Sequence, residues 1–188
     1  MGGKDRSGGA LEDSRREMQK AAQGDRRAFD RVAEAYANMV IALAYRMLGS
    51  RDEALDCAQD AFVKAWQNAD RYNPKWSVAT WLRRITKNLA VDRLRKRRRL
   101  THFPEGLEEQ HPDSGSGPEE HLRRKERAEI VREKLEALPE KYRAVLIMRE
   151  MEGLEISEIA RVTDAKPATV RWRLHRARSL FRDRWSSE

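Results

Sequence analysis

The sequence predicts an all-α fold in which two small helical domains are joined by a flexible linker, the C-terminal domain containing a helix-turn-helix. Apolar residues recur at helical spacings of three and four positions, as in Phe29, Val32, Ala33, Tyr36, Met39, Val40 and Leu43. No stretch alternates polar and apolar residues of the strand-forming types. The composition changes abruptly after Leu100, and this change divides the 188-residue chain into two parts.

The first domain is expected over residues 15–100. Residues 1–14 before it are dominated by glycine and charged residues, so they are expected to form a flexible tail. Ser50 and Glu53 form a capping-box pattern, because the hydroxyl of one and the carboxylate of the other can each accept from a free backbone N–H. This pattern predicts a helix that runs to about Asp70.

A further helix is expected after Ser77, which is a favoured N-cap residue. Its apolar residues are Trp81, Leu82, Ile85 and Leu89, and it ends in a run of five basic residues at 95–99. The segment between the two helices, residues 72–76, contains a proline and is expected to be a short loop.

Residues 101–125 are expected to be the linker, because proline, glycine and serine are mixed there with acidic residues. The second domain is expected over residues 126–188. Helical spacing resumes at Ile130, and Pro139 suits the first position of another helix, which Gly153 would end.

Two helices, at roughly residues 156–162 and 168–185, are expected to close the chain. The short turn between them gives helix-turn-helix spacing. One stripe of the last helix is apolar and is expected to pack inward against Leu146, Ile156 and Ile159; it consists of Val170, Leu174, Ala177 and Phe181.

The opposite face of the last helix is basic and carries an aromatic residue. It comprises Lys166 at the helix entrance, then Arg171, Trp172, Arg173, His175 and Arg176. Such a face suits a helix in the major groove of DNA, where arginine binds guanine edges or phosphates. A solvated charged face is the alternative, although an exposed tryptophan among arginines is unusual on an ordinary surface.

The helix after Ser50 carries an acidic face formed by Asp52, Asp56, Gln59 and Asp60, with Val63 beside them. Leu55, Ala58, Phe62 and Trp66 are expected on the core side of this helix. An acidic face in a basic protein repels DNA, so it suggests a protein partner with positive charge, with an ordinary solvated face as the alternative.

The next helix and the loop before it combine basic and aromatic residues. Arg84, Lys87, Arg95 and Arg98 share a helix face that could follow a DNA backbone. Tyr72 and Trp76 of the loop could stack on unpaired bases, or could equally belong to the core.

Lys and Arg number 39 against 31 Asp and Glu, and the net charge of +8 favours a polyanionic partner such as nucleic acid. No apolar run or leader segment indicates membrane insertion, so a cytoplasmic location is expected. The lone Cys57 is interpreted as a small buried residue. No catalytic, phosphate-binding or metal-ligand pattern is found; an enzyme, a cofactor and a metal are not expected.

The chain resembles the extracytoplasmic-function sigma factors, the smallest members of the sigma-70 class. In the first half, the strings at 24–25, 28–29, 45–49, 58–62, 80–82 and 88–93 are similar to the second conserved region of that family. In the second half, the strings at 138–143, 158–160, 169–171 and 176–178 are similar to its fourth region. Each string is short, but their order and spacing together are specific to the family.

The resemblance implies a role for each surface. The acidic helix, with Asp52, Asp56, Gln59 and Asp60, would dock on the largest subunit of bacterial core RNA polymerase. The loop and the helix after it would melt promoter DNA and capture a flipped base of the −10 element, through Tyr72, Asn73, Lys75, Trp76, Arg84, Lys87, Asn88 and Arg95. The helix-turn-helix would bind the −35 element through Lys166, Thr169, Arg171, Trp172, Arg173, His175 and Arg176.

Two positions depart from the family pattern, Ala168 and Trp172, so the promoter preference of relatives cannot be transferred. The family also implies an anti-sigma factor as inhibitor, and the free chain is expected to be a monomer. Two alternatives are an autonomous helix-turn-helix regulator and a nonspecific nucleic-acid-coating protein. The first lacks an evident effector pocket or dimerisation seam, and the second leaves the acidic face unexplained.

Overall fold

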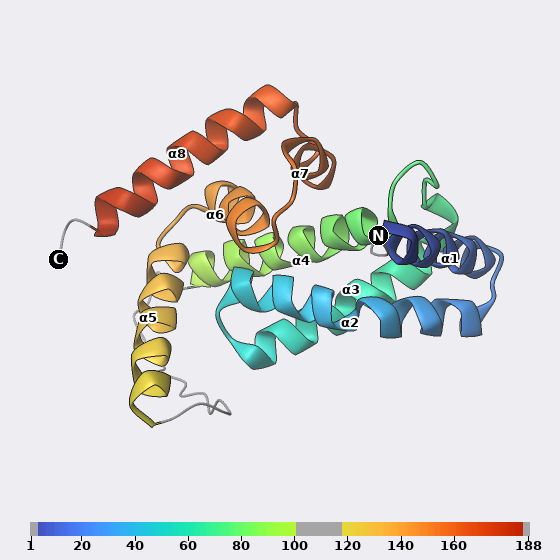
Figure 1. Ribbon diagram of the computed structural model, residues 1–188, viewed down its shortest axis with the longest axis horizontal. Helices are drawn as coiled ribbons and strands as arrows, with labels where there is room; N and C mark the ends of the chain where they lie inside the picture. Colours follow the sequence, from blue (N-terminus) through green and yellow to red (C-terminus); the bar gives the residue numbers. More distant parts are fainter. Residues whose placement is uncertain (1–3, 101–117, 186–188) are drawn as a thin grey trace.

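The computed structural model describes residues 4–100 and 118–185, and every regular element within these ranges is helical (Figure 1). The N-terminal unit consists of α1 (Lys4–Ala22), α2 (Arg26–Leu48), α3 (Arg51–Gln67), the 3₁₀ turn η1 (Ala69–Arg71) and α4 (Val78–Leu100). The C-terminal unit consists of α5 (Pro118–Glu136), α6 (Glu140–Leu146), the π-helical turn η2 (Ile147–Met151), α7 (Ile156–Thr163) and α8 (Pro167–Trp185). The predicted all-α class is confirmed.

Hydroxyl caps fix where α3 and α4 begin. The hydroxyl oxygen of Ser50 accepts from the backbone N–H of Glu53 at 3.4 Å, and that of Ser77 accepts from the N–H of Thr80 at 3.1 Å. Gly49 ends α2 with a φ of 83°, a left-handed conformation that costs glycine little. The chain therefore turns directly from α2 into α3, and both predicted helix starts are confirmed.

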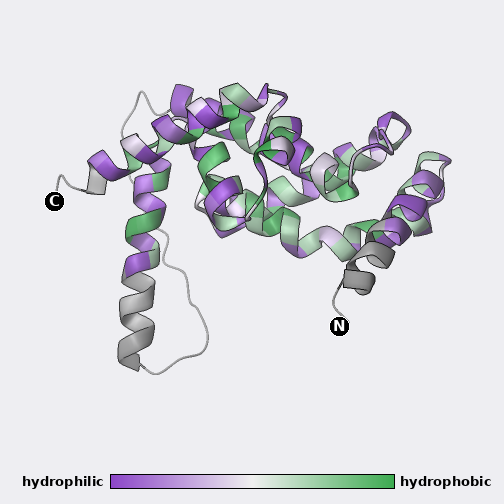
Figure 2. Ribbon diagram, turned by 45° about the horizontal axis from the view of Figure 1, so that its top comes forward, coloured by the Kyte–Doolittle hydropathy of each residue, from purple (hydrophilic) through white to green (hydrophobic). Residues whose placement is uncertain are grey.

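The apolar core consists of two clusters of buried side chains. One lies inside the N-terminal unit and joins α1, α2, α3 and α4 around Met18, Phe29, Val32 and Leu82. The other crosses between the two units and includes Met47, Leu48 and Leu94 together with Leu138, Val145, Ile159 and Val170. Hydrophobic residues gather where the helices meet, whereas α8 is largely hydrophilic (Figure 2). The two units are thus packed together.

Residues 4–14 of the predicted tail form the first turns of a helix, because α1 begins at Lys4. The later turns of α1 are anchored: Met18 and Ala21 are buried in the N-terminal cluster, and the Glu17 carboxylate accepts from Arg31 of α2. A helix that is anchored at one end extends easily, since each added residue brings one more backbone hydrogen bond.

The predicted linker, 101–125, is only partly described. Residues 101–117 lie outside the described residues, whereas residues 118–125 form the first turns of α5. Pro118 falls within the predicted linker, but it is the first residue of α5. Proline is favoured at this position because the N–H that it lacks would have no helical partner there.

The helix-turn-helix prediction is confirmed by α7 and α8. Between them Asp164 has a φ of 54°, and its backbone N–H caps α7 by donating to the carbonyl oxygen of Ala160. Aspartate tolerates this left-handed conformation better than most residues. The turn reverses the chain, so that α8 begins at Pro167 and leads away from α7 (Figure 1).

Candidate nucleic-acid interface

The orientation of α8 is set by its buried stripe. Val170, Leu174 and Ala177 are buried and Phe181 is half-buried, as the spacing predicts. The residues predicted to contact DNA therefore lie on the other side. Lys166, Arg171, Trp172, His175 and Arg176 are exposed, and Thr169 and Arg173 are half-buried.

Trp172 is a large apolar side chain of α8 that is mostly exposed, with 58% of its surface accessible. Its ring centroid lies 6.0 Å from that of Tyr142 in α6, and the Lys141 ammonium lies 4.9 Å from the Tyr142 ring. The indole is thus supported on one side and open on the other, among cations. Such a surface can contact both phosphates and the methyl group of thymine.

A second basic site lies in the N-terminal unit, where the loop after η1 faces α4. Its pocket has a volume of about 500 Å³ and is lined by Lys64, Asn68, Arg71, Asn73, Trp76, Trp81, Arg84, Ile85 and Asn88. Asn73, Trp76, Arg84 and Asn88 are among the residues predicted for the −10 element, so the structure brings these four together. Aromatic rings, amides and cations around one cavity can stack on a base, bind its edge and neutralise a phosphate.

Three cationic or amide side chains of this pocket were missed by sequence reasoning: Lys64, Asn68 and Arg71. They lie at the end of α3, at its C-cap and in η1, outside the loop and the helix that were predicted to form the −10 site. The Asn68 amide donates to the carbonyl oxygen of Lys64 at 2.8 Å, which fixes the end of α3 beside the pocket. Cationic and amide side chains suit contacts with nucleic acid, so their residue types could have suggested this role. Only the fold shows that they lie beside Trp76.

Tyr72 does not line this pocket. Its side chain is buried, and its hydroxyl donates to the carbonyl oxygen of Trp76 at 2.7 Å. Its ring packs edge-on against Trp81, with centroids 5.4 Å apart. Burial raises the pKa of the Tyr72 hydroxyl, so the hydroxyl stays protonated as a donor. The structure therefore places Tyr72 under the loop as a support, which favours the second of the two interpretations, that it belongs to the core.

The remaining predicted residues of this site lie in different surroundings. Arg84 is half-buried, and its guanidinium carbon is 5.3 Å from the Trp76 ring centroid. Lys87 donates to the amide oxygen of Asn88. Burial lowers the pKa of Lys87, and the Arg84 guanidinium lowers it further, while Asp164 raises it. Lys75 and Arg95 are exposed and do not line the pocket.

The acidic face of α3 is exposed as expected, with Asp52, Asp56, Gln59 and Asp60 all accessible. The Asp60 carboxylate also accepts from Arg93 of α4, at 2.5 Å. The prediction that Leu55 packs inward is wrong: 44% of its surface is accessible, and 49% of that of Val63. The face therefore combines carboxylates with two exposed aliphatic side chains, a composition typical of a protein contact.

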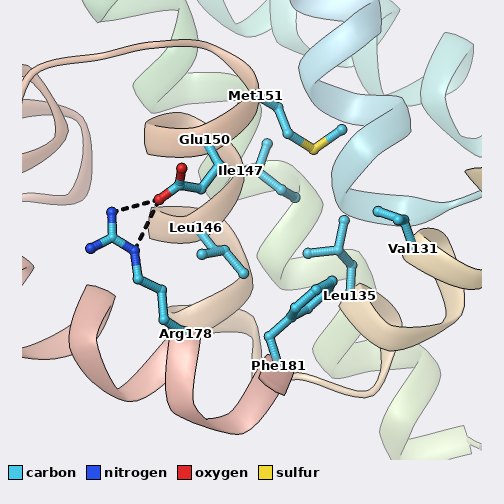
Figure 3. Close-up of a pocket in the computed structure, with 8 residues that line it drawn as sticks. All are labelled: Val131, Leu135, Leu146, Ile147, Glu150, Met151, Arg178 and Phe181. Carbon is cyan, nitrogen blue, oxygen red and sulfur yellow. Dashed lines mark hydrogen bonds and ion pairs between the residues drawn. The ribbon is translucent and has the colours of Figure 1, made fainter. Parts of the chain in front are cut away.

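A different cavity, of about 410 Å³, lies between α5, α6, η2 and α8 (Figure 3). Its walls are mostly apolar, formed by Val131, Leu135, Leu146, Ile147, Met151 and Phe181. At its edge Arg178 donates twice to the Glu150 carboxylate, at 2.6 and 3.0 Å. The cavity uses none of the residues predicted to contact DNA.

In the described part of the chain, no helix has the combined length and apolar character that crossing a membrane requires. Two family models match the sequence: sigma-70 region 2 over residues 32–100, and sigma-70 region 4 over residues 128–180. The first match contains the acidic face and the basic pocket, and the second contains the helix-turn-helix.

Individual proteins are similar over most of the chain. The ECF RNA polymerase sigma factor SigW of Bacillus subtilis is 32% identical over 176 residues, covering 89% of this chain and 94% of the relative. The ECF RNA polymerase sigma-E factor of Escherichia coli K12 is 33% identical over 172 residues, covering 87% and 90%. Among solved structures, CnrH in complex with the cytosolic domain of CnrY matches with a TM-score of 0.67 and 25% identity, over 94% of this chain and 99% of that one.

Proposed function

The chain belongs to the extracytoplasmic-function sigma factors of the sigma-70 class, and from this premise we propose how its surfaces divide the work of promoter recognition. As an alternative sigma factor, it binds core RNA polymerase and directs initiation at a particular class of promoters. The distribution of charge is the observation that supports these assignments. The exposed face of α3 is acidic, whereas the loop pocket and α8 are basic and carry aromatic residues. The polymerase supplies the chemistry, and the chain itself has no catalytic role.

The docking surface on core polymerase is the exposed face of α3. Asp52, Asp56 and Gln59 supply polar contacts, and Leu55 and Val63 supply apolar area between and beside them. Asp60 also belongs to this face, and in addition its ion pair with Arg93 links α3 to α4. A positively charged, partly apolar surface on the polymerase would complement this face and would discriminate against DNA.

The −10 site is the pocket beside the loop. A flipped base would enter between Trp76 and the amides of Asn73 and Asn88, and Arg84 would bind the adjacent phosphate. Lys64 and Arg71 add positive charge at the same cavity, so they would attract the single strand while duplex DNA melts. Lys75, Lys87 and Arg95 would act outside the cavity, along the neighbouring backbone. Tyr72 holds the loop from below.

The −35 site is the exposed face of α8, bound as duplex in the major groove. Arg171 and Arg176 are candidates for guanine contacts, while Lys166 at the helix entrance suits a phosphate. Trp172 and His175 add apolar and polar contacts between them. Trp172 departs from the usual family residue, so the −35 preference of this chain is expected to differ from that of relatives.

The cytoplasm is the compartment that this function requires, because polymerase and chromosomal DNA are there. We also expect a protein inhibitor. CnrH was solved in complex with the cytosolic domain of CnrY. For this chain we expect a protein partner of its own, an anti-sigma factor that competes with polymerase. In its absence the free chain is expected to be monomeric.

The deciding experiment adds the purified chain to sigma-free bacterial core polymerase on a pool of genomic promoter fragments. The proposal predicts discrete new start sites that require both components. No new start sites, combined with tight and specific DNA binding by the chain alone, would contradict it and favour an autonomous helix-turn-helix regulator.

A further inference from the structure

Trp172 lies at the centre of the exposed face of α8. Each residue of a helix is rotated by about 100° from the one before it, so Trp172 is about 200° from both Val170 and Leu174, which are buried. Its side chain therefore points away from the core, and 58% of its surface is accessible. It belongs to the second turn of α8, which begins at Pro167, and the first turns of a recognition helix are the part that contacts base edges.

The indole ring is supported by a buried neighbour. Its centroid lies 6.0 Å from that of Tyr142, and the planes of the two rings are inclined by 56°. Tyr142 is itself buried in the apolar cluster that crosses between the two units. Tilted aromatic pairs at this separation attract each other. An exposed side chain that is held in this way loses little conformational freedom when it binds a partner.

A small side chain leaves room beside the ring. Ala168 lies one turn before Trp172 and is exposed on the same face of α8. The side chains of a helix lean toward its N-terminal end, so the indole leans toward the turn that contains Ala168. The single methyl group of Ala168 does not prevent DNA from approaching the ring.

The side chains around Trp172 have a different chemistry. Arg171, Arg173 and Arg176 are cations, and their N–H groups suit phosphates and the acceptor atoms of guanine. The indole is uncharged and largely apolar, and its N–H can only donate. The exposed face of α8 thus presents a large apolar surface within a group of cationic donors.

Among the four bases, thymine matches the indole best in the major groove. Thymine presents an apolar methyl group at C5 and, beside it, the O4 acceptor. Cytosine lacks the methyl group and presents an amino donor, which the indole would remove from water without accepting a hydrogen bond from it. Guanine and adenine present only polar atoms. An apolar plane at this place therefore favours thymine.

We propose that Trp172 is a specificity-determining residue of the −35 site, and that its indole packs on the C5-methyl group of a thymine in the major groove. This inference rests on the proposed function of α8 and adds a requirement for one base. The promoters that this chain serves then carry a thymine at a fixed position of the −35 element.

The test removes a single methyl group from the DNA. The full-length chain is bound to core polymerase, and the probe is a promoter fragment whose start site the transcription assay has mapped. Each thymine of its −35 element, on either strand, is replaced in turn by deoxyuridine, which retains the O4 acceptor and the base pair. At one position the affinity of the wild-type holoenzyme should fall about fourfold, the loss that corresponds to one buried methyl group.

Variants of the chain identify the residue that contacts the methyl group. Trp172→Ala should bind the thymine and uracil fragments equally, whereas Trp172→Phe keeps an aromatic ring and should retain part of the preference. Both changes are made at an exposed side chain, so the buried stripe of α8 stays intact. Ile130→Ala shortens an exposed apolar side chain of α5 and is the matched control, which should keep the full preference. The affinity for core polymerase should be unchanged in all three variants.

A second measurement needs no variant of the chain. Cytosine at the same position should bind more weakly than uracil, and 5-methylcytosine should recover about fourfold of that loss, because it restores the methyl group. The proposal is overturned if the mapped promoters share no thymine in the −35 element, if deoxyuridine lowers the affinity at no position, or if Trp172→Ala keeps the preference for thymine over uracil. The absence of any new start site in the transcription assay would instead count against the proposed function.

Discussion

The Tyr72 hydroxyl donates a hydrogen bond of 2.7 Å to the carbonyl oxygen of Trp76, and thereby closes the loop beside the pocket that we propose for the −10 element. The tyrosine ring is fixed from below, because it packs on Trp81 in the N-terminal cluster. This part-buried hydrogen bond joins two turn contacts within the loop, in which the backbone N–H groups of Lys75 and Trp76 donate to oxygens of Asn73. We expect the position of the Trp76 ring to depend on the contact with Tyr72.

Tyr72→Phe is expected to slow promoter opening while leaving polymerase binding unchanged. The variant keeps the ring packing but removes the hydroxyl, and a single hydrogen bond of this kind contributes about 0.5–1.5 kcal/mol. Open-complex formation, followed by permanganate footprinting, should therefore be slower by a factor of about 2 to 12. Tyr36→Phe, a half-buried tyrosine of α2 in the same cluster, is the matched control. Equal rates of opening for Tyr72→Phe and the wild type would show that this hydrogen bond does not contribute to promoter opening.

Asp56→Lys is expected to weaken binding to core polymerase. The carboxylate is exposed on the face of α3 that we propose for docking, so reversing its charge would turn an attraction into a repulsion. The dissociation constant, measured by fluorescence anisotropy, should rise by about tenfold or more, and high salt should reduce the difference. Glu34→Lys makes the same charge change at an exposed site of α2 and should have little effect. A similar loss for both variants would mean that net charge, and not this face, controls docking.

Asp60→Lys should behave differently from Asp56→Lys. Asp60 is paired with Arg93 at 2.5 Å, so its replacement also releases α4 from α3. A loss of thermal stability together with weaker binding is expected for Asp60→Lys, whereas Asp56→Lys should lose binding alone. Differential scanning calorimetry separates the two, and equal melting temperatures would argue that the pair with Arg93 is unimportant for the fold.

Arg171→Ala and Arg176→Ala are expected to reduce promoter use and to leave polymerase affinity unchanged. Both side chains are exposed on α8, away from the acidic face of α3. Each bidentate base contact is worth about 1–3 kcal/mol, so discrimination at one −35 position should fall by a factor of about 5 to 150. Transcription from a library of −35 variants measures this loss, with Arg26→Ala as the control. Unaltered base preference in both variants would place the DNA-reading residues elsewhere.

The sequence predicted the helix-turn-helix well, because its determinants are local. The spacing of Val170, Leu174 and Ala177 defines one face of α8, and the opposite face follows from it without any long-range information. Ser50 and Ser77 similarly mark helix starts through contacts that reach only three residues along the chain. Features that depend only on residues close together in the sequence can therefore be predicted without knowledge of the fold.

The core side of α3 was predicted less well. Hydrophobic size alone places Leu55 inside, but the helix buries Ala54, Ala58, Ala61 and Ala65. Small side chains let α2 and α4 approach α3 closely, so the alanine face makes the tighter packing. Leu55 is left on the outside, on the face that we propose for docking.

The contact between the two units was not predicted, because it depends on residues far apart in the sequence. Glu152 meets Arg46 and Arg83 only after a π-helical turn has rotated it toward them. The aromatic residues of the loop pose the same difficulty: Tyr72 and Trp76 are four positions apart, yet one supports the loop and the other lines the pocket. A sequence pattern cannot distinguish these two positions.

Cys57 is expected to contribute a pH-dependent part of the stability. It is fully buried between α3 and α4, and burial raises the pKa of its thiol from 9.0 to about 11. Because the folded pKa is the higher one, the contribution is fully present below pH 9 and is lost as the pH rises from about 9 to about 11. The free energy of unfolding of the wild type should fall by about 2–3 kcal/mol more than that of Cys57→Ala over this interval. Urea unfolding at a series of pH values measures both free energies, and parallel curves would show that the thiol ionises equally easily in the folded and unfolded states.

Alkylation by iodoacetamide is an independent test of the burial of Cys57. At pH 8 it should be slow in the native chain and fast in urea, because only the unfolded chain presents an accessible thiolate.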